Sequence, residues 1–232
     1  MTLKYGTFIV VEGIDGSGKT TLIKSLKKQF EAKGVKVNVF SAIGEGDTGK
    51  KLKTLCLDLL SVNMKTPQEE VANQKTIIDL FLSGVFNCLL SYVRPAIERG
   101  EVVILDRYFH STFAYQVLNS ELEQYFYTVY NGKLNAYPTT SLEPDYVIFC
   151  NTTAKLSLER SKGRAGDNVI DSWDIDKKQS IIERYEKTHK WYPGYTFVNQ
   201  LHLNTEDFTK LDLTEINEMI NNVSALYNTR KI

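Results

Sequence analysis

The chain has 232 residues, which suits one α/β domain with a full core and is short for two independent domains. Its 28 lysines and arginines balance 28 aspartates and glutamates, so the charge gives no reason to expect a nucleic-acid polymer as partner. Cys56, Cys88 and Cys150 fit no zinc-binding spacing and no signal-peptide layout opens the chain, so we expect reduced thiols in a cytoplasmic protein, or in the host cytoplasm if the source is viral.

The first predicted elements alternate between strand and helix. TFIVVE (7–12) is a short apolar run that ends at glycines, which is typical of a buried parallel strand. A helix is predicted from 19 to about 32, where apolar residues recur at helical spacing before a terminating glycine. A second strand (35–40) and a second amphipathic helix (50–60) follow.

A long helix is predicted from Thr66 to about Arg99. Thr66 can cap its start, Pro67 suits the first helical position, and Glu69 completes a capping box. The most apolar part, 77–93, is interrupted by polar residues, whereas a membrane span needs roughly 20 uninterrupted apolar residues. We therefore expect no membrane segment.

The second half of the chain continues the alternation. Strands are predicted at 101–106, 145–150 and, more weakly, 196–203. Helices are predicted at 153–162, 174–190 and 213–227. Strands that alternate with helices predict a parallel sheet covered on both faces, in one doubly wound α/β domain over residues 1–232.

Residues 13–20, Gly-Ile-Asp-Gly-Ser-Gly-Lys-Thr, match G-x-x-x-x-G-K-[ST] in full, between a predicted strand and a predicted helix. Such glycines let backbone N–H groups face phosphate oxygens, Lys19 would reach the β- and γ-phosphates, and the Thr20 hydroxyl would ligate Mg²⁺. The alternative is a glycine-rich turn without a ligand. The position of the motif, between a strand and a helix, favours a nucleoside triphosphate site. The predicted triphosphate-binding residues are Gly13, Gly16, Ser17, Gly18, Lys19, Thr20 and Thr21.

A second informative stretch is ILDRYFHSTFAYQ (104–116). Asp106 ends a predicted buried strand, where a carboxylate can hold Mg²⁺ directly or through water. Arg107 beside it can bind a phosphate with two hydrogen bonds. The alternative is an ion pair at the end of the strand.

Three stretches together resemble the thymidylate kinase family: VEGIDGSGKTT (11–21), RPAIERGEVVILDRYFHSTFAYQ (94–116) and EPDYVI (143–148). They follow one another in the order of that family over most of the chain. The resemblance implies a P-loop nucleoside monophosphate kinase fold with a five-stranded parallel sheet and a short mobile lid at about 160–173. It also implies transfer of the γ-phosphoryl group of ATP to dTMP with Mg²⁺, commonly in a homodimer.

The resemblance assigns residues around the acceptor nucleotide. Asp15 would face the 3′-hydroxyl of the sugar, and Arg107 would bind the acceptor phosphate. Tyr115 would stand against C2′, where a ribose hydroxyl would clash, while Ser111 and Gln116 would lie near the base. The alternative for Tyr115 is a position in the core. The alternative for Ser111 and Gln116 is a solvated position on a helix.

The segment 158–174 is expected to form the lid, because cationic side chains alternate there with glycines. Gly16 follows Asp15, so the phosphate loop supplies no arginine. The resemblance then makes Arg164 the lid arginine that acts on the transferred phosphoryl group, and places Arg160 near adenine. The alternative is an exposed basic loop. The predicted catalytic residues are Lys19, Arg107, Arg164 and Asp15.

Two departures from the family concern the acceptor. The segment SAIGEGDTG (41–49) lacks the family's arginine near the acceptor phosphate and instead carries Glu45 and Asp47. On the long helix Phe81 fits the position that stacks on the base, but Val85 stands where the family has a base-reading arginine. We therefore expect dTMP as the acceptor, with a broadened or altered base preference as the alternative.

Two further alternatives stay open. The long helix is apolar on more than one face, which fits either a homodimer contact through residues 66–99, as the resemblance implies, or burial inside the monomer. A deoxynucleoside kinase, with Glu45 as general base for a 5′-hydroxyl, is the nearest competing function. A nucleotide-binding module without phosphoryl transfer is least favoured.

Overall fold

A computed structural model of the chain describes residues 6–136, 143–162, 173–189 and 198–230. Its centre is a five-stranded sheet with the order β2-β3-β1-β4-β5, in which every neighbouring pair is parallel. This confirms the predicted α/β fold. The strands are β1 (Thr7–Glu12), β2 (Val37–Ser41), β3 (Val102–Asp106), β4 (Tyr146–Asn151) and β5 (Asn199–Asn204).

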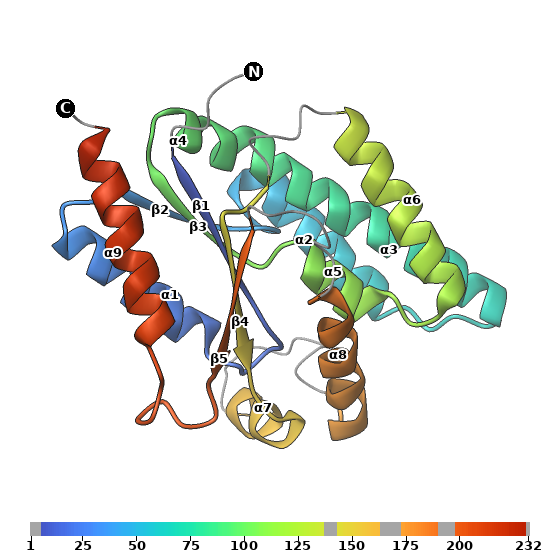
Figure 1. The fold of residues 1–232 in the computed structure, drawn as a ribbon. Coiled ribbons are helices and arrows are strands. Elements are labelled where there is room, and N and C mark those ends of the chain that lie inside the picture. The colour runs from blue at the N-terminus through green and yellow to red at the C-terminus, as the bar shows by residue number, and fades with distance from the viewer. Residues whose placement is uncertain (1–5, 137–142, 163–172, 190–197, 231–232) are drawn as a thin grey trace.

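Helices cover both faces of the sheet (Figure 1), which explains why β1 is buried along its whole length. Phe8 and Val10 belong to one apolar cluster and Ile9 and Val11 to the other, because successive side chains of a strand point to opposite faces. The first face packs against α3 (Pro67–Cys88), α5 (Phe109–Gln116), α6 (Ser120–Ala136) and α8 (Ile175–Thr188). The second packs against α1 (Lys19–Ala32) and α9 (Thr214–Thr229).

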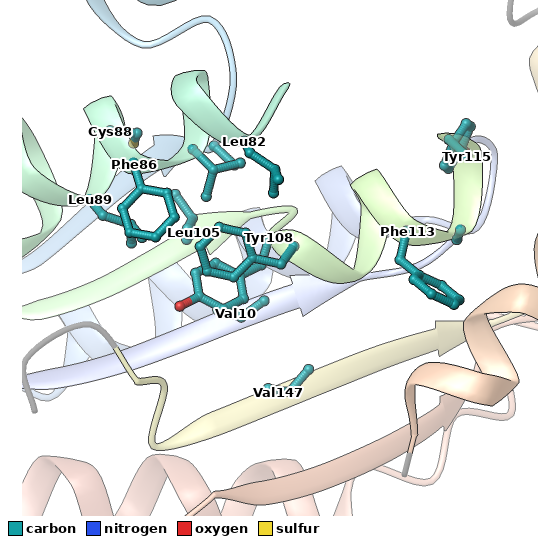
Figure 2. Packing of buried hydrophobic residues seen from close by; sticks show 14 of the residues in the cluster. Val10, Leu82, Phe86, Cys88, Leu89, Leu105, Tyr108, Phe113, Tyr115 and Val147 are labelled. Atoms are coloured by element: carbon teal, nitrogen blue, oxygen red, sulfur yellow. The ribbon is translucent and has the colours of Figure 1, made fainter. Parts of the chain in front are cut away.

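The larger cluster joins α3 to the sheet. Figure 2 shows Leu82, Phe86 and Leu89 near Leu105 of β3, and Val10 of β1 and Val147 of β4 belong to the same cluster. These three side chains are at most 4% exposed. Burying each one contributes roughly 1.5–3 kcal/mol, so α3 is held by its packing more than by helix propensity.

The predicted long helix is continuous but changes its hydrogen-bond register near its end. After α3, residues Leu89–Val93 form one π-helical turn, in which Arg94 N–H donates to the Leu89 carbonyl, before α4 (Arg94–Glu98). Pro95 has no N–H to continue the i→i−4 series, and the wider turn accommodates it. By length and composition Pro67–Glu98 passes for a membrane span with mean hydropathy 1.6, yet half of that window is buried inside the protein.

Two helices were not predicted from the sequence. The short α5 follows β3, and α6 packs on α3. Asn119 is the signal for α6, because its side-chain oxygen accepts a hydrogen bond of 2.9 Å from Leu122 N–H and acidic residues occupy the first turn. The remaining helices, α2 (Gly46–Leu60) and α7 (Ala154–Ser161), lie where helices were predicted, although α2 begins four residues earlier.

The register of the sheet sets the position of the site. Val11 pairs with Asp106 and Glu12 with Phe149, so the carboxyl ends of β1, β3 and β4 lie at one edge. The loops after these strands meet there, as in other open parallel sheets.

Candidate active site

The phosphate loop follows β1 and adopts a conformation that requires glycine. Gly13, Gly16 and Gly18 have φ values of 140°, 80° and 92°, a region that other L-residues rarely adopt. A Cβ atom on Gly16 would lie 2.5 Å from the Ser157 carbonyl oxygen, so α7 packs directly on the loop. The Lys19 ammonium donates to the Gly13 and Ile14 carbonyls at 2.8 and 2.9 Å and lines the adjacent cleft.

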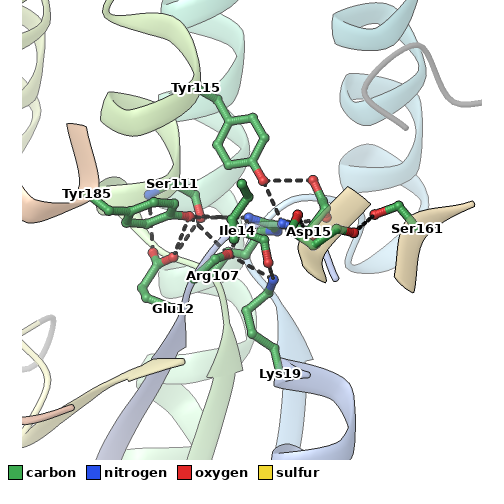
Figure 3. Close-up of polar contacts among 11 residues, drawn as sticks. Glu12, Ile14, Asp15, Lys19, Arg107, Ser111, Tyr115, Ser161 and Tyr185 are labelled. Atoms are coloured by element: carbon green, nitrogen blue, oxygen red, sulfur yellow. Dashed lines mark hydrogen bonds and ion pairs between the residues drawn. The ribbon is translucent and has the colours of Figure 1, made fainter. Parts of the chain in front are cut away.

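Asp15 turns its carboxylate away from the loop, toward the segment that follows β3 (Figure 3). Arg107 Nη2 contacts Asp15 Oδ1 at 2.5 Å, and Tyr115 Oη donates to Asp15 Oδ2 at 2.7 Å. Burial opposes ionisation of Asp15, but Arg107 and Lys19 outweigh it, so the pKa of Asp15 lies well below its ordinary value. Asp15, Arg107 and Tyr115 therefore form one charged group beside the phosphate loop.

Arg107 has a φ of 71°, uncommon for a residue with a side chain, and its N–H donates to the Val11 carbonyl at 3.0 Å. This strained backbone aims the guanidinium at Asp15. Arg107 Nη1 also donates to Ser111 Oγ at 3.1 Å and to Tyr185 Oη at 3.3 Å.

Glu12 is a site residue that sequence reasoning missed. Its carboxylate is fully buried and accepts hydrogen bonds from Tyr108 N–H at 2.6 Å, Ser111 Oγ at 2.7 Å and Tyr185 Oη at 3.1 Å. Burial raises the pKa of Glu12. The signal was the acidic residue directly after the apolar run of β1, and its effect is to fix the Arg107–Ser111 segment to the phosphate loop.

A cleft of about 250 Å³ lies between the phosphate loop, α2, α3 and α5. The structure brings eleven predicted site residues to its walls: Asp15, Gly16, Gly18, Lys19, Thr20, Phe81, Asp106, Arg107, Ser111, Tyr115 and Gln116. Val85 lies beside Phe81 in the wall, as the sequence comparison with the family implied. Lys53 and Leu57 of α2 also line the cleft and were not predicted.

The residues beside Lys19 fit Mg²⁺. Asp106 Oδ1 is buried without a hydrogen-bond partner in the described part of the chain, and so is Ser17 Oγ. Thr20 is exposed at the start of α1 and lines the same cleft. Mg²⁺ is commonly bound by one or two protein oxygens together with substrate phosphates, which matches this sparse set of ligands.

Arg160 lies outside the cleft, at the other end of the phosphate loop. It donates to the Thr205 and Glu206 carbonyls at 2.9 Å each, and its guanidinium stacks over Phe208 at 5.0 Å. The Phe208 ring lies against Gly18, because a Cβ atom there would be 2.1 Å from it. Arg164, the predicted lid arginine, and most of the predicted lid lie outside the described residues.

Glu45 does not line the cleft. Its carboxylate accepts a hydrogen bond of 3.2 Å from Ser41 N–H. It also lies near Cys88, where burial and the Glu45 charge raise the thiol pKa to about 12. This position is unsuitable for a general base acting on a substrate in the cleft.

Comparison with known proteins agrees with this geometry. The sequence matches the thymidylate kinase family over residues 11–211. It is 32% identical to the thymidylate kinase of Thermoanaerobacter sp. over 189 residues, which are 81% of this chain and 86% of that protein. It is 29% identical to the enzyme of Desulfovibrio desulfuricans, with 80% of both chains covered, and 29% identical to that of Buchnera aphidicola, with 84% and 87% covered. This chain belongs to the thymidylate kinase family.

Proposed function

We propose that this protein transfers the γ-phosphoryl group of ATP to dTMP, giving dTDP and ADP. The observation that carries the proposal is one cleft shared by two kinds of groups. Lys19 and glycines of the phosphate loop line it, and so do Asp15, Arg107 and Tyr115, which contact one another and would hold the acceptor. The printed names of the relatives, thymidylate kinases, support the choice of substrate.

The acceptor would be held by this charged group. Arg107 would bind its phosphate, and the ionised Asp15 would accept a hydrogen bond from the sugar 3′-hydroxyl. Tyr115, held by Asp15, would fill the space that a ribose 2′-hydroxyl needs, which favours deoxynucleotides. Ser111, whose hydroxyl donates to Glu12, would act mainly by keeping Arg107 in place.

The donor would be held by the phosphate loop. Lys19 would contact the β- and γ-phosphates, and the loop N–H groups from Gly13 to Thr21 would face phosphate oxygens. Thr20 and Asp106 would hold Mg²⁺, which when bound neutralises charge on the β- and γ-phosphates. Arg160 would border adenine, and Arg164 would complete the site from a lid over about 160–173 of a single 1–232 kinase domain. Phosphoryl transfer depends mainly on such positioning and charge, so no covalent intermediate with the protein is needed.

The competing deoxynucleoside kinase is not favoured, because its required base, Glu45, faces Ser41 and Cys88 and not the cleft.

We also propose a cytoplasmic homodimer that uses the 66–99 helix. Of the apolar residues that suggested this contact, Leu82, Val85, Phe86, Leu89 and Val93 are buried in the monomer. The dimer proposal therefore depends on the family resemblance and on the half-buried Leu90, and the mass in solution at micromolar concentration tests it.

The function is tested by incubating the protein with Mg²⁺-ATP and one acceptor at a time. The acceptors are dTMP, dUMP, dCMP, dGMP, dAMP, the ribose form of TMP and thymidine, and products are identified by mass. We expect ADP and dTDP from dTMP and little reaction with the ribose form. Phosphorylation of thymidine with no reaction of dTMP would contradict the proposal.

A further inference from the structure

Two glutamine side chains meet where α3 lies beside α5. Gln74 and Gln116 are 8% and 1% exposed. Gln74 Nε2 donates to the Gln116 backbone carbonyl at 3.1 Å and to Gln116 Oε1 at 2.9 Å. One amide NH₂ group thus donates both of its hydrogens to the same residue.

This pair has one chemically consistent orientation. A backbone carbonyl can only accept a hydrogen bond, so the Gln74 atom that faces it must be the NH₂ group. The second hydrogen of that group then requires an acceptor, which is Gln116 Oε1. The Gln116 amide is thereby fixed with its oxygen toward Gln74 and its NH₂ group on the opposite side.

The Gln116 NH₂ group is available to the cleft. Gln116 lines the cleft wall, and within the described residues no protein group accepts from its Nε2. This nitrogen is not among the buried polar atoms that lack a partner, so it has access to the cleft. The site therefore presents a hydrogen-bond donor of fixed direction.

The position of Gln116 along α5 relates this donor to the base. Gln116 is the last residue of α5 and directly follows Tyr115, whose ring lies 5.2 Å from the Arg107 guanidinium. An acceptor with its phosphate at Arg107 and its sugar at Tyr115 would direct the far edge of its base toward Gln116. Val85, in the same wall, cannot donate a hydrogen bond.

We propose that Gln74 is a positioning residue that sets the Gln116 amide as a donor to the oxygen at position 4 of the base, which makes the site selective for thymine and uracil over cytosine. This inference deepens the proposed function and depends on it. Cytosine carries an amino group at position 4, so two donors would face each other and both would lose their partners. Sites built on such polar pairs reject the mismatched analogue strongly.

The test compares kcat/KM for dTMP and dCMP in the wild type and three variants. In Gln74→Glu a protonated carboxyl donates to the Gln116 backbone carbonyl and accepts from Gln116 Nε2, which turns the amide and presents its oxygen to the base. Gln74→Met leaves the amide free to rotate. Gln68→Glu adds the same acid at an exposed position of the same helix and serves as the matched control.

We expect the wild type and Gln68→Glu to prefer dTMP by about 100-fold or more. Gln74→Glu should lower this ratio roughly tenfold or more, through a higher KM for dTMP and a higher kcat/KM for dCMP, with Gln74→Met in between. Equal losses for both substrates in the two Gln74 variants would show a merely structural role and overturn the inference. A wild type without preference would overturn it as well.

Equilibrium binding of dTMP and dCMP, measured by calorimetry on the same proteins, separates this inference from the proposed function. Absence of phosphoryl transfer by the wild type would contradict the function. The ratio of the two dissociation constants would still show whether Gln74 sets the base preference, and an unchanged ratio in Gln74→Glu would reject it.

Discussion

Lys53 is the residue best placed to replace the arginine that the 41–49 segment lacks. It lines the cleft, and its Cδ would lie 3.3 Å from a Cβ atom on Gly44, so its stem follows that segment. Lys19 and Arg107 already donate to loop carbonyls and to Asp15, whereas Lys53 makes no hydrogen bond or ion pair with the described residues. Its ammonium is therefore available to an anionic acceptor.

We predict that Lys53→Ala raises KM for dTMP roughly tenfold, with a small effect on kcat and on KM for ATP, because hydrogen bonds to charged groups are among the stronger ones. Binding of thymidine, which has no phosphate, should not change. Steady-state kinetics and thymidine calorimetry measure both effects, with Lys51→Ala on the exposed side of α2 as the control. If thymidine and dTMP weakened equally, Lys53 would act on the base.

At the residue scale, sequence reasoning located those cleft residues that lie close together in the chain. The glycines, Lys19 and the Asp106–Gln116 stretch are each read from one contiguous segment. Glu12, Tyr185 and Gln74 were missed because their roles depend on contacts between segments far apart in the chain, such as α8 with the end of β1. No local pattern records such a contact.

At the scale of elements, boundaries with a cap were predictable and those set by packing were not. The start of α3 agrees with prediction, because Thr66 Oγ1 accepts a hydrogen bond of 3.2 Å from Glu69 N–H and Pro67 occupies the first position. The Glu69 carboxylate accepts a hydrogen bond of 2.8 Å from Lys65 N–H. A capping box would instead use the N–H of Thr66. The π-helical turn at Leu89–Val93 depends on how Pro95 and the core are accommodated together, which residue propensities do not describe.

We predict that Thr66→Ala lowers the free energy of unfolding by about 1 kcal/mol, because the Glu69 N–H loses its acceptor at the helix start. For a domain of this size that corresponds to a Tm lower by about 2–4 °C in thermal unfolding. Thr76→Ala is the matched control, since Thr76 is exposed in the interior of α3, where alanine has the higher helix propensity. A loss of equal size in both variants would contradict a capping role.

At the scale of the whole molecule, the three histidines of the chain come together from three distant segments. The rings of His110, His189 and His202 lie 5.5, 4.4 and 5.2 Å from the ring of Phe149 on β4, near its carboxyl end. Burial, with His189 nearby, lowers the pKa of His110 to about 3, and burial with His202 nearby lowers that of His189 to about 4. The alternating pattern predicted that the strands are parallel, but it did not predict their order across the sheet, on which this cluster depends.

The cluster makes stability depend on pH. A histidine with a folded-state pKa below the unfolded value of 6.5 binds a proton more readily in the unfolded chain, so its stabilisation is complete above pH 6.5 and is lost as the pH falls. Glu215, beside His202, and Glu12, 3.7 Å from His110, favour the charged histidines and moderate the effect. Glu12 opposes it further, because its raised pKa lets the folded protein bind a proton more readily than the unfolded chain as the pH falls. Glu101, whose pKa is lowered to about 2, and Asp15 lose their stabilisation mainly at more acidic pH than the histidines do.

We therefore predict that the free energy of unfolding falls between pH 6.5 and 4.5 by about 2 kcal/mol for each histidine that stays uncharged in the folded protein, because the unfolded chain takes up protons that the folded protein excludes. Denaturant unfolding across this range measures the loss. His189→Phe should reduce the slope by close to one proton, because phenylalanine keeps the aromatic contact with Phe149 and does not titrate. Lys187→Gln, an exposed change in the last turn of α8, should leave the slope unchanged. A His189→Phe slope equal to that of the wild type would assign the acid sensitivity to the carboxylates.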